Sequence, residues 1–106
     1  DVILPSNGST INERRRIAVN GQLSVGIAVD RNGRAGGTPD VRVQGVPVEE
    51  ERDAFLDDAI AAAAEAMRGA PRDREKLREQ VRLAVRRVAT RWTGKKPVID
   101  VVVVQV

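Results

Sequence analysis

The side chains of this chain that could do chemistry are arginines. Three of them recur every fourth residue in the second half of the chain, which would align them in one solvent-facing row on a helix. Three more are consecutive near the amino terminus. Contact with a phosphate backbone needs basic side chains but no particular motif. The candidate RNA-contact residues are therefore Arg14, Arg15, Arg16, Arg78, Arg82 and Arg86.

The charges are also segregated by segment, which offers a second explanation for the basic row. Residues 49–68 hold seven acidic and two basic residues, a net charge of −5, whereas residues 72–96 hold ten basic and three acidic residues, a net charge of +7. If both segments are helices and run antiparallel, the acidic start of one lies beside the basic end of the other. Intramolecular pairing and RNA contact therefore both remain open.

The residue types that dominate enzyme sites are missing. The 106 residues include no histidine and no cysteine. Zinc sites use mainly these two residues, and histidine activates most serine and cysteine nucleophiles. We therefore predict no catalytic residue, no metal ligand and no cofactor site in this segment, which is not an enzyme by itself.

The apolar residues predict neither a membrane span nor an export signal. No run approaches the ~20 apolar residues that cross a bilayer, and no signal-peptide pattern opens the chain. The absence of cysteine fits a reducing compartment. We expect a cytoplasmic protein with no membrane partner.

Two regions of unequal length divide the chain. Residues 1–12 are rich in turn-forming residues and show no apolar period, so we interpret them as a linker. Residues 13–106 are long enough for a single domain. Only two aromatic residues, Phe55 and Trp92, are available to its core, which must be largely aliphatic.

Three segments alternate between apolar and other residues and are predicted to be strands. They span Gln22–Asp30, Asp40–Val46 and Val98–Val106. Gly36–Pro39 separates the first two as a loop. The last strand is apolar on both faces along most of its length.

Two segments between the second and third strands show helical periodicity. Glu49–Arg68 carries an apolar stripe, and its acidic residues gather at its start, where the helix dipole favours negative charge. Asp73 is placed to cap a second helix, which ends at Gly94.

The order predicts an α+β fold, a two-layer sandwich with β-β-α-α-β connectivity. The two antiparallel helices cover one face of a three-stranded mixed sheet. The last strand should run parallel to the first and antiparallel to the second. Alternation assigns the inward face to Leu23, Val25, Ile27, Val29, Val41, Val43, Ile99, Val101 and Val103.

The opposite sheet face has no cover in this arrangement. It would combine small side chains on the first strand with valines on the last, which suits close approach of another surface. A pair of ordinary exposed valines is the alternative, since much protein surface is apolar. The candidate interface residues for self-association, as a homodimer or larger assembly, are Ser24, Gly26, Ala28, Val102 and Val104.

Two stretches resemble a known family. Glu13–Asp30, with its three arginines followed by a Gly turn and a Val-rich strand, is similar to the opening of the C-terminal domain of ribonuclease J. Thr93-Gly94-Lys95-Lys96-Pro97 resembles that family's stretch before the last strand. The resemblance covers about residues 11–106, and it implies that residues 1–12 are a linker from an upstream catalytic core.

The resemblance carries an expectation about function. Ribonuclease J enzymes are metal-dependent 5′-to-3′ exoribonucleases and endoribonucleases of the metallo-β-lactamase superfamily, with zinc held by His-rich motifs that this chain lacks. The resemblance thus implies a non-catalytic appendage that supports assembly of a bacterial enzyme of RNA processing and decay. The rival interpretation is a small autonomous RNA-binding module that uses the basic second helix.

Overall fold

The order of secondary-structure elements along the chain matches the predicted one. The computed structural model describes residues 21–46, 49–70 and 72–106. The elements are β1 (Gln22–Val29), β2 (Ala35–Gln44), the short 3-10 helix η1 (Glu49–Glu51), α2 (Arg52–Arg68), α3 (Arg74–Thr93) and β3 (Val98–Gln105). The α+β class with β-β-α-α-β connectivity is therefore confirmed. The predicted linker 1–12 and residues 13–20 lie outside the described residues.

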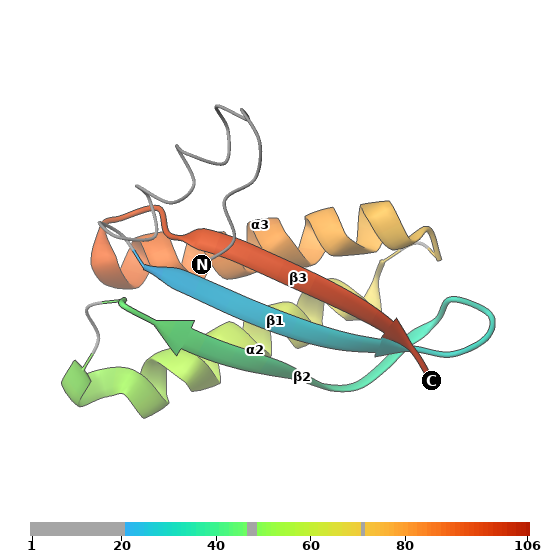
Figure 1. Ribbon diagram of the computed structural model, residues 1–106, viewed down its shortest axis with the longest axis horizontal. Helices are drawn as coiled ribbons and strands as arrows, with labels where there is room; N and C mark the ends of the chain where they lie inside the picture. Colours follow the sequence, from blue (N-terminus) through green and yellow to red (C-terminus); the bar gives the residue numbers. More distant parts are fainter. Residues whose placement is uncertain (1–20, 47–48, 71) are drawn as a thin grey trace, which may run out of the picture.

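The sheet has three strands in the order β2-β1-β3 (Figure 1). β1 pairs with β2 in antiparallel fashion and with β3 in parallel fashion. The parallel direction of β3 relative to β1 was predicted from the two antiparallel helices that precede β3. The central position of β1 explains why its inward side chains are almost completely buried, with Leu23 0% and Val25 1% exposed.

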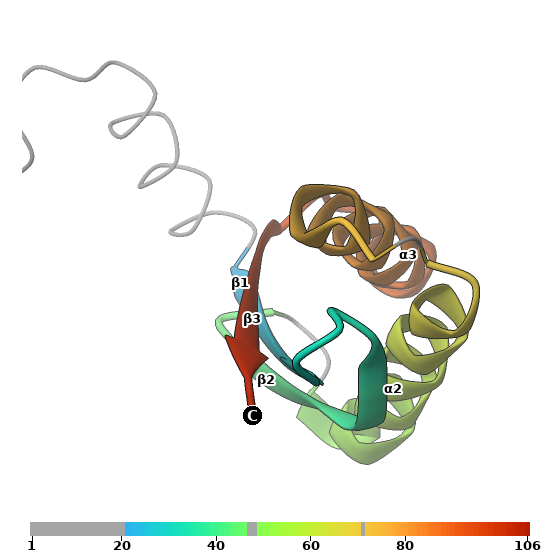
Figure 2. The same cartoon turned by 90° about the vertical axis from the view of Figure 1, so that its right-hand side faces the viewer.

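Both helices lie on the same side of the sheet, which leaves the other side uncovered by described residues (Figure 2). α2 packs over β2 and α3 packs over β3. The inward face is the predicted one. Val43 and Val103 alone among its predicted members are half-buried, because they lie near the ends of the two outer strands. The core is aliphatic apart from Phe55, which is fully buried.

The first hairpin differs from its prediction. Gly36–Pro39 was expected to form the loop, but these residues belong to β2, and the connection is Asp30–Arg34. Pro39 is tolerated because β2 is an outer strand whose free edge needs no N–H donor. The register slips between Gly26 and Ala28, opposite this glycine-rich start. The prediction was wrong because turn-forming residues were assigned to a turn without regard to edge position.

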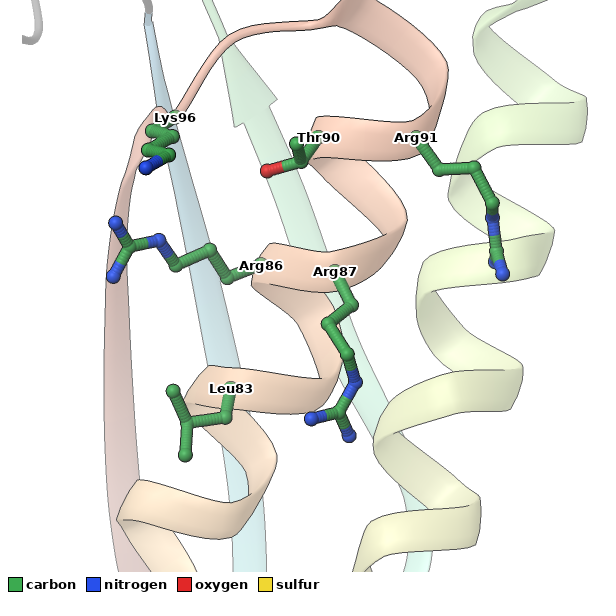
Figure 3. A pocket seen from close by; sticks show the side chains of 6 residues that line it. All are labelled: Leu83, Arg86, Arg87, Thr90, Arg91 and Lys96. Carbon is green, nitrogen blue, oxygen red and sulfur yellow. The ribbon is translucent and has the colours of Figure 1, made fainter.

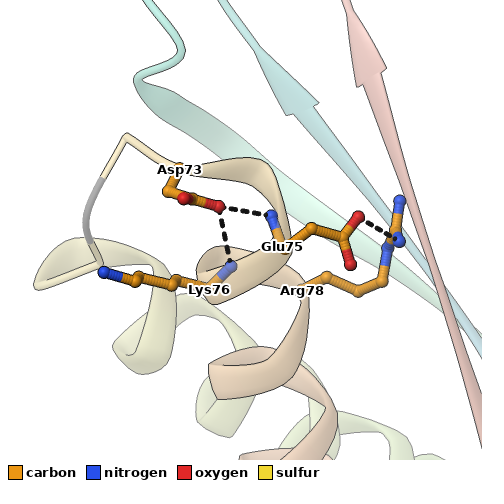
Figure 4. A network of polar contacts seen from close by, with 4 residues as sticks. All are labelled: Asp73, Glu75, Lys76 and Arg78. Carbon is orange, nitrogen blue, oxygen red and sulfur yellow. Dashed lines mark hydrogen bonds and ion pairs between the residues drawn. The ribbon is translucent and has the colours of Figure 1, made fainter.

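The two helices begin differently. Asp73 caps α3 as predicted, since its Oδ1 accepts the backbone N–H groups of Glu75 at 2.9 Å and Lys76 at 3.2 Å (Figure 4). The predicted start of the first helix at Glu49 forms the 3-10 turn η1, and α2 proper starts at Arg52 without a side-chain cap.

An aromatic contact and a hydrogen bond join the two helices. The rings of Phe55 and Trp92 meet edge to face, with centroids 5.8 Å apart. The indole N–H of Trp92 donates to Oδ2 of Asp58 at 2.9 Å. Trp92 is therefore engaged within the helical layer, with its one polar group satisfied.

Gly21, which precedes β1, lies very close to the backbone of Gly45. Its φ is +85°, and a Cβ there would lie 2.6 Å from the carbonyl carbon of Gly45. Replacing it with alanine combines an unfavourable backbone angle with a clash against backbone, so Gly21→Ala should reduce the free energy of unfolding by about 2 kcal/mol or more. Gly36→Ala is the control, because a Cβ at that position would meet no other part of the chain within 4 Å and its φ is ordinary. Urea unfolding measures both, and equal stability of the two variants would contradict the close approach.

Asp30 makes the hairpin connection sensitive to acid. Its Oδ1 accepts the N–H groups of Asn32 at 2.8 Å and Arg34 at 3.0 Å. The hydrogen bond from Arg34 chiefly holds the pKa of Asp30 below its ordinary value of 3.8. A carboxylate with a lowered folded-state pKa contributes stability above its unfolded pKa and loses it as pH falls through the folded value.

The resulting prediction compares wild type with Asp30→Asn. Wild type should be the more stable protein near neutral pH, and its advantage should start to shrink below pH 3.8 and vanish below the folded-state pKa. Urea titrations between about pH 7 and about pH 2 measure this difference. An advantage that stays constant over the whole range would contradict the role of the Asp30 charge.

Candidate functional site

The five candidate interface residues lie together on the uncovered side of the sheet, which we call the open face. Pairing places Gly26 beside Val102, and Ala28 beside Val104. Ser24, Gly26 and Ala28 are half-buried by their neighbours, whereas Val102 and Val104 are 49% and 51% exposed. The strand alternation that buries Val101 thus leaves two large apolar side chains in water.

Charged residues on β2 and β3 flank the small outward side chains of the central strand β1. Ser24 pairs with Arg42 on one side and with Asp100 on the other, so the three residues form one row across the sheet. Arg42 Nε lies 3.1 Å from Oδ2 of Asp40, and both side chains are well exposed. Exposed pairs of this kind contribute little stability. Because the face carries both signs, a two-fold related copy need not meet like charge with like charge.

Two arginines of the predicted row on α3 are engaged in hydrogen bonds with glutamates of the same helix. Arg78 donates to Oε1 of Glu75 at 2.8 Å, as Figure 4 shows, and Arg82 donates to Oε1 of Glu79 at 2.7 Å. Arg74, one turn earlier, donates to Oε1 of Gln105 on β3 at 2.9 Å. The row therefore runs along the outer strand β3.

The expectation of a solvent-facing row is corrected accordingly. The side chains of Arg78 and Arg82 are 42% and 35% exposed, and Arg86 is also half-buried. Arg78 Nε is buried without a hydrogen-bond partner. The aliphatic stems of these residues cover apolar surface while their charged ends stay at its rim. Arg14, Arg15 and Arg16 lie outside the described residues.

A basic groove on α3 gathers four positively charged side chains. It has a volume of about 440 Å³ and is shown in Figure 3. Arg86 extends toward β3, whereas Arg87 and Arg91 extend toward α2. No described residue that lines it carries a carboxylate. The residues of the basic groove are Leu83, Arg86, Arg87, Thr90, Arg91 and Lys96.

The sequence holds a signal that separates the two kinds of arginine. Arg78 and Arg82 each follow a glutamate by three residues and are ion-paired to it. Arg86, Arg87 and Arg91 have no acidic residue three or four positions before them. Among the described residues they form no ion pair. Arg87 and Arg91 were missing from the predicted RNA-contact set because four-residue spacing alone was used to choose it.

The turn before β3 positions the basic groove's lysine. Gly94 adopts a left-handed conformation with φ 71° and donates its N–H to Thr90 O at 2.8 Å. Thr93 Oγ1 donates to Ala89 O at 2.8 Å and accepts the N–H of Lys95 at 3.0 Å. Pro97 is fully buried. This segment thus ends α3 abruptly and sends Lys96 back over the groove.

No group of three or more histidine, cysteine, aspartate or glutamate side chains in the described segments could hold a metal ion. Within the same segments, no helix is both long and apolar enough to span a membrane. The two sites that remain are surfaces, one on each layer of the molecule.

Comparison with known sequences identifies the family. Residues 9–106 match the ribonuclease J C-terminal domain family. The chain belongs to this family. It is 38% identical over 101 residues to the ribonuclease J of Sinorhizobium meliloti, with 91% of this chain covered. The match spans only 18% of that protein's length. Both surfaces described above fall within the family region.

Matched substitutions test the assignment of faces on β3. Val101 is 6% exposed and Val102 is 49% exposed, although they are adjacent on one strand. Val101→Ala should lower the free energy of unfolding by about 2 kcal/mol, because it removes buried methyl groups and leaves a cavity. Val102→Ala should cost less than about 0.5 kcal/mol in the monomer. Chemical unfolding at low protein concentration decides this, and the reverse ranking would mean that the faces are exchanged.

Proposed function

We propose that this chain is a non-catalytic association domain of a bacterial ribonuclease J, and that the open face binds a second copy of the same domain. The observation that carries the proposal is the exposure of Val102 and Val104 on the side of the sheet that neither α2 nor α3 covers. Burying a valine fully is worth about 1.5–3 kcal/mol, so four valines across a two-fold axis supply a real driving force.

The dimensions of the face set the strength of this association. An eight-residue strand extends about 26 Å and three strands span about 14 Å, giving a footprint of about 400 Å². A specific dimer usually buries about 800 Å² on each partner. The open face alone therefore supports weak pairing. The larger parent protein, of which the matched region is 18% in the relative, would supply further contact area.

The position of β3 favours a second copy as the occupant. β3 is an outer strand, so one of its edges has no strand partner among the described residues. It is eight residues long and rich in valine, and Asp100 is its one charged residue. Unprotected strands of this kind bind other chains readily. The exposed valines and the free edge lie on the same strand, so a neighbouring copy can use both.

Catalysis is assigned to the rest of the parent protein in this proposal. The parent would be a zinc-dependent 5′-to-3′ exoribonuclease and endoribonuclease of RNA processing and decay that acts in the cytoplasm. The relative's name, ribonuclease J, supports the ribonuclease activity of the parent. The present segment carries neither histidine nor cysteine to hold such a metal. Its part is to bring parent molecules together.

The association predicts a concentration-dependent mass. Sedimentation of the 11.5 kDa chain should show a rise toward twice that mass as its concentration approaches about 1 mM. Val102→Asp and Val104→Asp should each abolish the rise, because they place a carboxylate in the apolar contact. Their folds should stay intact, since both sites are exposed.

Leu83→Asp is the matched control. Leu83 is 39% exposed and lies on α3, in the opposite layer. The same loss of an apolar side chain there should leave association unchanged. A wild-type protein that stays monomeric over the whole concentration range, or a Leu83→Asp variant that dissociates as readily as Val102→Asp, would contradict the use of the open face.

A further inference from the structure

The basic groove of α3 contains three arginines that differ from those earlier in the helix. Arg78 and Arg82 are paired to glutamates one turn earlier. Arg86, Arg87 and Arg91 form no such pair with a described residue, and no described residue that lines the groove is acidic. Glu65, which lines a neighbouring hollow together with Arg87 and Arg91, is ion-paired to Arg68. Arg86 extends toward β3, whereas Arg87 and Arg91 extend toward α2, so the three guanidinium groups spread positive charge over the C-terminal half of α3. A polyanion would neutralise that charge.

The spacing of these side chains suits a chain of phosphates. Arg87 and Arg91 are one helical turn apart, a rise of about 6 Å, similar to the separation of neighbouring phosphates. Arg86 leaves the same helix toward β3, which widens the charged surface (Figure 3). A guanidinium group can donate two parallel hydrogen bonds to two oxygens of one phosphate. The hydroxyl of Thr90, which also lines the groove, adds another hydrogen-bond donor. Leu83 offers an apolar contact at one end.

We propose that the basic groove binds the phosphate backbone of RNA, with Arg86, Arg87 and Arg91 as the principal contacts. The choice of RNA as the polyanion rests on the proposed function, in which RNA is the substrate of the parent. The proposal moves the RNA surface from the expected row to the C-terminal half of α3. Arg78 and Arg82, which are engaged with glutamates, contribute little.

Binding by this groove is independent of base sequence. Proteins that recognise single-stranded bases stack them on aromatic side chains. The groove contains no aromatic residue, and the indole of Trp92 is held by Asp58 and Phe55. The interaction is then mainly electrostatic, weak, and strongly dependent on salt.

The groove and the open face can be occupied together. The groove belongs to the helical layer, and the open face is the opposite side of the sheet (Figure 2). Two copies joined through their open faces would therefore carry their grooves on the outer sides of the pair. Association would double the number of RNA contacts without covering any of them.

Fluorescence anisotropy of a short labelled oligouridine with the complete chain tests the proposal. Three phosphate contacts predict a slope of about −2 in the dependence of log affinity on log salt. A triple variant with Arg86→Gln, Arg87→Gln and Arg91→Gln should bind at least about tenfold more weakly at low salt and lose most of that slope. An oligocytidine of equal length should bind as oligouridine does.

A second triple variant controls for net charge. Arg31→Gln, Arg52→Gln and Arg72→Gln remove the same three charges from exposed sites outside the groove. This variant should keep most of the affinity and the slope. Equal losses in both triple variants, or wild-type binding to an oligoglutamate peptide and not to oligouridine, would overturn the proposal. Sedimentation of the groove variant should still show self-association, so a failure here is distinct from a failure of the open face.

Discussion

The structure depends on one constraint: the two helices cover only one of the two faces of the sheet. Both helices that the structure describes cover the same face of the three-stranded sheet, and no described residue covers the other face. The inner layer is filled by side chains such as Leu23, Phe55 and Val81, all essentially inaccessible to solvent. Strand alternation then forces every second residue of β1 and β3 to the uncovered side. The exposure of Val102 and Val104 follows directly from the burial of Ile99 and Val101.

The open face of the sheet and the surface of α3 differ in the side chains that they expose. On β1, the outward positions are Ser24, Gly26 and Ala28, which keep the centre of the open face flat and low in apolar area. On α3, Arg78 and Arg82 are paired with glutamates one turn earlier, whereas Arg86, Arg87 and Arg91 form no ion pair with a described residue. Small side chains permit close approach of another surface, whereas unpaired guanidinium groups attract a polyanion. Each layer is therefore suited to a different kind of partner.

Most of the fold could be predicted because its signals are local and repeated. Period-two alternation identified β1 and β3, and the Asp73 cap and Gly94 turn bounded the second helix. The start of β2 could not be predicted in this way. Gly36–Pro39 has turn-forming composition, and only its place at the edge of the sheet lets it continue the strand.

The candidate sites were partly predictable for a related reason. The faces of a strand follow from sequence alone, so Val102 and Val104 were placed correctly. Helical spacing placed Arg78, Arg82 and Arg86 on one stripe but did not reveal that this stripe lies against β3. That depends on which strand the helix covers. The ion pairs to Glu75 and Glu79 could be inferred from sequence and should have directed attention to Arg87 and Arg91.

Nuclear magnetic resonance of a mixed sample tests the central claim most directly. Equal amounts of chain with labelled valine methyl groups and unlabelled chain are combined at high concentration, and contacts between molecules are recorded. The account predicts intermolecular contacts from the methyl groups of Val102 and Val104 and none from those of Val81 and Val85, which are fully buried residues of α3. Intermolecular contacts confined to the helical layer, or an absence of any from β3, would contradict it.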